Sequence, residues 1–259
     1  MSAREPILLS FIVPTYNEEK NLPRLLASIK YCCDKFGIPH EIIVVDDKSA
    51  DATIMIAQAF NAKIILNDRR MGEYPSRNLG ALVAKGEYLI FTGADVIIPC
   101  DTLYRVISSL KEDKRLAGMY VRTYPHDGSL VAKLEFVTWY TLTTLWYYIS
   151  GEANASAAFF AIKRSAFLTT KGFEDVAYAD SMLSRELSKK FKIRPCFKHV
   201  VYVSGRRIRE MGLKEFNKLH TVMFLDIFFP FLRKSKYLVI LKKYLKKHVH
   251  DRISSTVYA

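Results

Sequence analysis

Short apolar runs alternate with amphipathic segments along the first half of the chain. The apolar runs have the length of buried strands, and the segments between them repeat apolar residues every three or four positions, which predicts helices. This alternation predicts an α/β fold with a mostly parallel sheet and helices on both of its faces. The predicted strands are Ile7–Val13, Glu41–Val45, Lys63–Leu66 and Glu87–Thr92, and the predicted helices are Asn21–Phe36, Asp51–Phe60, Ser76–Lys85 and Asp101–Leu110.

The second half of the chain is less regular. Its predicted elements are an aromatic helix over Val131–Ile149, a strand over Ala157–Ile162, a helix over Asp180–Lys190 and a strand over His199–Val203. From Leu213 onward the pattern is helical, apolar and basic. We therefore expect residues 216–259 to form a helical, basic C-terminal extension of the main domain.

Polar residues follow three of the predicted strands at the point where each strand ends. Pro14-Thr15-Tyr16-Asn17-Glu18 follows the first strand, Asp46-Asp47 the second and Gly93-Ala94-Asp95 the fourth. Because ligands of open α/β sheets bind beyond the carboxyl ends of the strands, these side chains predict one nucleotide-type site. Structural roles stay open here, since Asp46 or Asp47 can cap the next helix and Asp95 can be a turn residue.

Four further residues are candidates for chemistry. Asp180 begins a predicted helix, where it is either an N-cap or a general base that removes a proton from an acceptor hydroxyl. Arg206 and Arg207 follow a predicted strand, and paired guanidinium groups bind phosphate oxygens well, although a basic surface loop gives the same pattern. Arg77 is a candidate for the same anion.

A formal net charge of +13 over 259 residues favours an anionic partner. A phosphorylated substrate, an acidic membrane surface and nucleic acid all fit that charge, and so does a solvated basic surface. The sequence lacks a dinucleotide fingerprint, a phosphate-binding loop, a nucleophile elbow and zinc-ligand spacing. Those classes of site are therefore not expected.

The cysteines and the apolar segments bear on location. Cys32, Cys33, Cys100 and Cys196 have no metal-ligand spacing, and we expect all four to be reduced, which is consistent with a cytosolic site. We expect no signal peptide, and no uncharged apolar stretch reaches the roughly 20 residues of a membrane-spanning helix. The sequence thus predicts a cytoplasmic protein.

Taken in order, these motifs resemble those of glycosyltransferase family 2, whose members are inverting, nucleotide-sugar-dependent enzymes of GT-A (Rossmann-like) fold. The resemblance extends from about Leu8 to Phe216. Its motifs are Val13–Glu19, Val44–Thr53, Gly72–Gly86, Gly151-Glu152, Ala158–Phe160, Gly172–Glu174 and Val203–Arg207 with Gly212. It implies a GT-A domain over residues 1–215, with a nucleotide-binding half over about 1–125 and an acceptor half over about 126–215.

The resemblance also implies roles for the candidate residues. Thr15, Tyr16, Glu18 and Asp46 would bind the base and ribose of a UDP-sugar or GDP-sugar, with Asp47 and Arg77 nearby, and Pro14 would belong to the same nucleotide-sugar site. Asp95 would hold a Mg²⁺ or Mn²⁺ ion and the diphosphate. Asp180 would be the catalytic base, and Arg206 and Arg207 would stabilise the leaving diphosphate.

Two positions depart from the pattern of the family. The first carboxylate of its DXD motif is Gly93 in this chain, and the first acidic residue of its acceptor-side pair is Ala179. Asp95 and Asp180, which are closest to the chemistry, are present. The departures leave open weaker metal binding, a different donor, or a non-catalytic protein that binds a nucleotide or glycan without turnover.

The acceptor implied by the resemblance is a glycan or a lipid-linked molecule. Phe224–Lys247 combines apolar residues with a lysine-rich end, which fits a membrane-interface segment, an amphipathic core helix or an oligomer contact. Our hypothesis is a peripheral enzyme on the cytosolic face of an anionic membrane. The aromatic segment Trp139–Tyr148 is either a buried helix or a platform for a sugar or lipid chain. A homo-oligomer stays open, and we expect no nucleic-acid partner.

Overall fold

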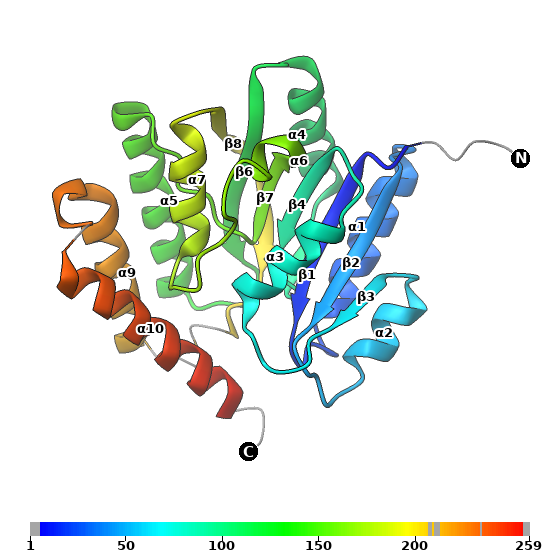
Figure 1. Ribbon diagram of the computed structural model, residues 1–259, viewed down its shortest axis with the longest axis horizontal. Coiled ribbons are helices and arrows are strands. Elements are labelled where there is room, and N and C mark those ends of the chain that lie inside the picture. The colour runs from blue at the N-terminus through cyan, green and yellow to red at the C-terminus, as the bar shows by residue number, and fades with distance from the viewer. Residues whose placement is uncertain (1–5, 207–208, 210–212, 234, 256–259) are drawn as a thin grey trace, which may run out of the picture.

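The computed structural model describes residues 6–206, 209, 213–233 and 235–255. At its centre is one mixed sheet with helices on both faces (Figure 1). The strands lie in the order β3 (Lys63–Leu66), β2 (His40–Asp46), β1 (Leu9–Thr15), β4 (Tyr88–Thr92), β7 (Phe159–Lys163), β6 (Leu116–Pro125), β8 (Lys192–Val203) and β5 (Val96–Ile97).

Helices cover the sheet from two sides and form two cores. One core contains α1 (Leu22–Lys35), α2 (Thr53–Ala59) and α4 (Cys100–Glu112), and the other contains α3 (Glu73–Val83), α6 (Arg164–Phe167) and α7 (Ala179–Ser188). The helix α5 (Leu130–Ser150) lies beside β6. Gly80 lets α3 lie very close to β1, since a Cβ at this position would be 2.6 Å from Cγ2 of Ile12.

The parallel half of the sheet was predicted from the sequence, and the other half was predicted only in part. β1 is parallel to β2 and β4, and β2 is parallel to β3. The predicted strand over Ala157–Ile162 corresponds to β7, which is antiparallel to β4. No strand was predicted over β6, because Gly118 and the polar residues Arg122 and Thr123 interrupt its apolar pattern. Long-range pairing with β7 and β8 stabilises this strand.

The C-terminal extension consists of α9 (Leu213–Phe228), the short helix η1 (Pro230–Leu232) and α10 (Lys236–Ser255). Figure 1 shows α9 and α10 on the side of the molecule where α5 and α7 lie. A small third core joins Val222, Leu238 and Leu245 to Tyr178, the residue that precedes α7. No helix in the described part of the chain combines the length and the apolar character needed to cross a bilayer.

The expectation that all four cysteines are reduced is wrong. A disulfide joins Cys32 in α1 to Cys100 at the start of α4, while Cys33 and Cys196 are free and buried. The two helices pack together on one face of the sheet and bring these Cα atoms to 4.9 Å, a separation suited to a disulfide. The cysteines therefore no longer support a cytosolic site.

Candidate active site

A cavity of about 270 Å³ lies beyond the carboxyl ends of β1 and β4. These ends meet at one edge because β1 is parallel to both β2 and β4, with Thr15 in register with Asp46. The predicted residues that line the cavity are Pro14, Thr15, Tyr16, Glu18, Asp47, Arg77, Asp95, Asp180 and Arg206. Residues from both halves of the chain thus share one cavity. The remaining candidates are Asp46, which does not line the cavity, and Arg207, which lies outside the described residues.

Asp47 organises the loop that leads into α3. One of its carboxylate oxygens accepts hydrogen bonds from the backbone N–H of Met71 (2.7 Å) and from the side-chain amide of Asn67 (2.8 Å), and the other accepts from the N–H of Gly72 (2.9 Å). The loop holds the guanidinium of Arg70 over the ring of Tyr16, 3.5 Å from its centroid. This pair gives the cavity a flat aromatic and cationic wall, which is suited to a nucleobase.

Asp46 has a structural environment. Its carboxylate accepts hydrogen bonds from the hydroxyl of Thr15 (3.0 Å) and from both the N–H (2.9 Å) and the hydroxyl (2.5 Å) of Ser49. These bonds join the ends of β1 and β2 and hold the turn in which Lys48 has a positive φ of 71°. The side chain is almost fully buried, and its contact with base and ribose stays a prediction.

Glu18 and Arg206 form an ion pair across the cavity wall, between the segment after β1 and the segment after β8. Burial is the main cause of a raised pKa at Glu18; Arg206 opposes that rise and the nearby Asp95 adds to it. Val96 of β5 pairs antiparallel with Val203 of β8, and the N–H of Ser204 donates a 3.2 Å hydrogen bond to the carbonyl of Asp95. These contacts bring the end of β8 next to Asp95.

Asp95 fits a divalent cation that is held mainly by the substrate. Among the described residues, no group of three or more His, Cys, Asp or Glu side chains is arranged as a metal site. Mg²⁺ and Mn²⁺ do not require one, because one or two carboxylates suffice when phosphate oxygens and water complete the coordination. Gly93 leaves space beside this carboxylate, since a Cβ there would lie 2.9 Å from Oδ1 of Asp95.

Asp180 lies in the first turn of α7, and Tyr178, not Asp180, occupies the N-cap position. Its Oδ2 accepts a hydrogen bond from the N–H of Ala157 (2.8 Å), and its Oδ1 accepts from the N–H of Ser181 (2.9 Å) and from the hydroxyl of Tyr74 (3.4 Å). Burial is the main cause of a raised pKa at this carboxyl. A raised pKa and a fixed orientation are the properties of a candidate base.

Arg77 lies almost fully buried on α3, where one guanidinium nitrogen donates to the carbonyl of Thr92 at the end of β4 (3.0 Å). Another nitrogen lies 4.0 Å from the carboxylate of Glu73. Its Nε has no hydrogen-bond partner among the described residues. Arg77 therefore places a positive charge in the wall beside the end of β4, as an anion site requires.

A second cavity, of about 210 Å³, adjoins the first and is more apolar and aromatic. Its walls include Trp139 and Tyr140 of α5 and Met223 and Ile227 of α9. The residues that line both cavities are Glu73, Tyr74, Thr123, Phe136, Ser156 and Asp180. The aromatic helix thus packs on the protein and also lines a cavity, and Asp180 lies where the two cavities meet.

The sequence patterns did not identify several residues that line the first cavity. Arg70, Glu73 and Tyr74 all belong to the segment that follows β3. A signal was present, because β3 was itself a predicted parallel strand and its carboxyl end is marked by the charged run Asp68-Arg69-Arg70. A search beyond every predicted parallel strand would have included this loop.

The model of the family described as "Glycosyl transferase family 2" matches residues 10–169, which is more than half of the chain. The chain belongs to this family. A curated relative, "Undecaprenyl-phosphate 4-deoxy-4-formamido-L-arabinose transferase" of Aeromonas hydrophila subsp. hydrophila, is 29% identical over 117 residues, or 43% of this chain and 36% of the relative. The matched segment spans little more than a third of the curated relatives' length.

Solved structures of glycosyltransferases agree with the fold. The mannosyltransferase PcManGT from Pyrobaculum calidifontis, in complex with GDP-Man and Mn²⁺, is 20% identical with a TM-score of 0.66, over 98% of this chain and 77% of that one. Glucosyl-3-phosphoglycerate synthase from Mycobacterium tuberculosis, with Mn²⁺ and UDP, is 18% identical with a TM-score of 0.62, over 85% and 79%. These likenesses confirm the predicted GT-A fold.

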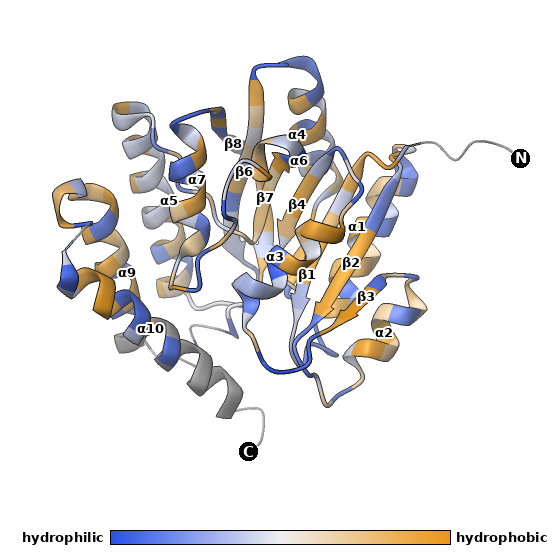
Figure 2. Ribbon diagram, in the orientation of Figure 1, coloured by the Kyte–Doolittle hydropathy of each residue, from blue (hydrophilic) through white to orange (hydrophobic). Residues whose placement is uncertain are grey.

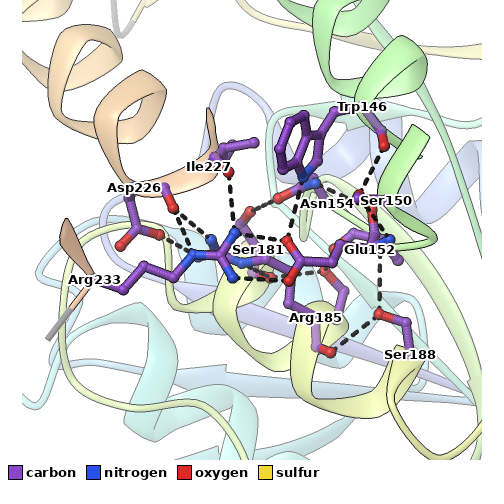
Figure 3. Close-up of polar contacts among 12 residues, drawn as sticks. Trp146, Ser150, Glu152, Asn154, Ser181, Arg185, Ser188, Asp226, Ile227 and Arg233 are labelled. Atoms are coloured by element: carbon purple, nitrogen blue, oxygen red, sulfur yellow. Dashed lines mark hydrogen bonds and ion pairs between the residues drawn. The ribbon is translucent and has the colours of Figure 1, made fainter. Parts of the chain in front are cut away.

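A buried ion-pair network joins the C-terminal extension to α7, the helix that presents Asp180 (Figure 3). Asp226 of α9 is fully buried and pairs with both Arg185 of α7 and Lys242 of α10. The backbone carbonyl of Asp226 accepts further hydrogen bonds from Arg185 (3.1 Å) and from Arg233 (2.7 Å), and Arg233 forms a two-bond pair with Glu152 (2.8 and 2.6 Å).

We expect Asp226→Ala to lower the free energy of unfolding by about 3–5 kcal/mol, because it leaves Arg185 and Lys242 buried without their carboxylate. Denaturant unfolding followed by circular dichroism measures this change. The matched control is Asp113→Ala, which breaks a solvent-facing pair with Lys192 and should change stability much less. Equal losses in the two variants would contradict a structural role for the network.

Proposed function

We propose that this protein is an inverting glycosyltransferase that moves a sugar from a nucleotide-sugar donor to a lipid-linked acceptor at the cytosolic face of a membrane. The observation that supports this most is the position of Asp180 at the junction of a polar cavity and an apolar cavity. A base at that junction can reach an acceptor in one cavity and a donor in the other. Membership of glycosyl transferase family 2 supports the reaction class.

The larger cavity is proposed to bind the donor. Tyr16 and Arg70 would stack with the base, and Thr15 and Asp47 would lie near the ribose. Arg77 and Arg206 would lie near the diphosphate, where guanidinium groups stabilise charge on the leaving group. The neighbouring structures were solved with GDP-Man and with UDP, so both bases stay open for this chain.

Asp95 would hold a Mg²⁺ or Mn²⁺ ion together with the phosphate oxygens of the donor. When bound, the ion would neutralise charge that grows on the leaving diphosphate. Mn²⁺ in the two neighbouring structures supports a divalent cation. Arg206 donates a hydrogen bond to Glu18 from one of its guanidinium nitrogens. The diphosphate of the donor would compete with Glu18 for that nitrogen.

The smaller cavity is proposed to bind the acceptor. Its lining by Trp139, Tyr140 and Met223 favours an apolar or sugar surface. The curated relative is named for transfer involving undecaprenyl phosphate, which supports a lipid-linked acceptor. Asp180, held by Ala157 and Tyr74, would take the proton from an acceptor hydroxyl as its oxygen attacks the anomeric carbon opposite the nucleoside diphosphate. That attack would invert the configuration of the sugar.

We expect the protein to release nucleoside diphosphate from one member of a panel of UDP-, GDP- and dTDP-sugars, with Mn²⁺ or Mg²⁺ and a membrane lipid extract as the acceptor source. Asp95→Ala should lower the rate by about 100-fold or more, since it removes the only carboxylate proposed for the metal. The matched control is Asp101→Ala, an exposed aspartate in the first turn of α4, which should leave the rate unchanged.

Two results of this assay would contradict the proposal. Metal-dependent nucleotide binding without release under any acceptor condition would identify a non-catalytic binding protein of the same fold. Absence of nucleotide binding would contradict both the proposed glycosyltransferase and a non-catalytic nucleotide-binding protein.

The pH dependence of kcat/KM should report Asp180. Its base form is active and burial raises its pKa, so the rate should fall as the pH drops, beginning at a higher pH than an ordinary aspartate would require. Asp180→Asn should lose the acid limb and about 10²- to 10⁴-fold in rate. Glu18→Gln is the control, because Glu18 also has a raised pKa. This variant should keep the fall in rate at low pH if Asp180 causes it. An unchanged limb in Asp180→Asn would show that Asp180 is not the base.

A further inference from the structure

The helix α10 exposes apolar residues and buries a lysine. Tyr237, Ile240 and Leu241 are 85%, 55% and 36% exposed, and Tyr244 is 47% exposed, whereas Lys242 is only 5% exposed. By their spacing these four residues lie on one face of the helix, which we term the outer stripe of α10 (Tyr237, Ile240, Leu241 and Tyr244), while the exposed Val239 lies on another flank. A helix that served only to cover a core would present these residues inward.

The buried network determines which face of α10 points outward. Lys242 pairs with the fully buried Asp226, and Leu238 and Leu245 lie on the same inward face, in one core with Val222 of α9 and with Tyr178, the residue before α7. Turning the helix to bury the outer stripe would leave the Asp226 carboxylate without one of its two cations, which is costly in a buried site. The exposure of the stripe is therefore built into the packing of the extension.

Aromatic residues next to the start of α10 enlarge this apolar surface. Phe231 of η1 is 78% exposed and Phe229 is 37% exposed, with 5.9 Å between their ring centroids. Phe224 of α9 is also exposed and lies 6.0 Å from Phe229. Figure 2 shows apolar ribbon along α9 and at the start of α10, on the side of the molecule away from α1 and α2. Adjacent exposed aromatic and aliphatic side chains of this kind mark a binding surface.

A row of lysines borders the outer stripe. Lys236, Lys243 and Lys247 are exposed, and at 100° per residue they lie together on the flank of the stripe that is opposite the buried face. Asp226 is the only acidic residue in the sequence between 217 and 247, and it is buried. Residues 217–247 therefore supply no exposed carboxylate to neutralise the row; Glu215 and Asp251 lie outside that interval. A second copy of the same surface would bring two such rows together, which disfavours self-association.

We propose that the outer stripe of α10, with Phe229 and Phe231, is a docking face for an anionic lipid bilayer. Apolar and aromatic side chains would enter the interface while the flanking lysines extend toward anionic headgroups, as in interfacial amphipathic helices. This inference rests on the proposed function, because it assigns the surface that brings the site to a lipid-linked acceptor. α9 lines the apolar cavity, and its Asp226 pairs with both Lys242 of α10 and Arg185 of α7, so docking would hold that side of the molecule at the membrane.

Flotation with vesicles tests the face directly. The wild type should float with phosphatidylcholine vesicles that contain phosphatidylglycerol at low salt, and should stay at the bottom with phosphatidylcholine alone. Ile240→Gln with Leu241→Gln should lower the bound fraction about tenfold, and Lys243→Gln with Lys247→Gln should do the same at low salt. The matched control is Met55→Gln with Leu82→Gln, which changes two exposed apolar residues on α2 and α3 and should bind as the wild type does.

A gain of signal complements these losses. The emission of Tyr237→Trp should shift to the blue when anionic vesicles are added, beyond the change of the wild type with its own two tryptophans. Met55→Trp should show no such additional shift. Both substituted positions are exposed, so both variants are expected to fold, and matching thermal unfolding checks this.

Three results would overturn the docking face: no binding of the wild type to anionic vesicles at low salt, undiminished binding by Ile240→Gln with Leu241→Gln, or a dimer that depends on the stripe in the absence of vesicle binding. Nucleoside diphosphate release measured with a detergent-dispersed acceptor separates this inference from the proposed function. Release of nucleoside diphosphate by a protein that does not bind vesicles would contradict only the docking face. Vesicle binding without nucleoside diphosphate release under any condition would contradict only the proposed enzymatic function.

Discussion

The candidate site depends on the parallel pairing of β1 with β2 and β4. This register places Thr15 opposite Asp46 and brings the polar segment after β4 to the same edge of the sheet. The buried Asp46 carboxylate ties the two strand ends together through Thr15 and Ser49, so that Asp47 can hold the loop that presents Arg70. Arg77 and Asp95 line the same cavity, so strand pairing determines the wall proposed to bind the nucleotide.

Local patterns in the sequence predicted the parallel strands and most of the residues at their ends, because buried strands are apolar runs and their polar ends follow directly. β6 was missed, since Gly118 and Arg122 interrupt its pattern and only pairing with distant strands stabilises it. The Cys32–Cys100 disulfide was missed because its partners are 68 residues apart and meet only when α1 packs on α4. Arg70 was missed because it lies four residues beyond the end of β3, in a loop whose path over Tyr16 depends on the distant Asp47.

The orientation of the C-terminal helices depends on buried ion pairs, whereas the parallel strands follow local apolar patterns. Its basic and apolar composition predicted helices, but composition could not show that Lys242 faces inward and Ile240 outward. That orientation depends on the buried carboxylate of Asp226, which also pairs with Arg185 on the helix that presents Asp180. The same network therefore supports the apolar cavity and determines the outer surface of α10.

In the proposed mechanism, Asp180 activates an acceptor in one cavity for direct attack on a donor in the other. The most direct test is the anomeric configuration of the transferred sugar, measured by NMR from the coupling constant of its anomeric proton in the product. One displacement from the face opposite the nucleoside diphosphate predicts inversion, so an α-linked donor should give a β-linked product. A product that retains the donor's configuration would rule out this direct displacement.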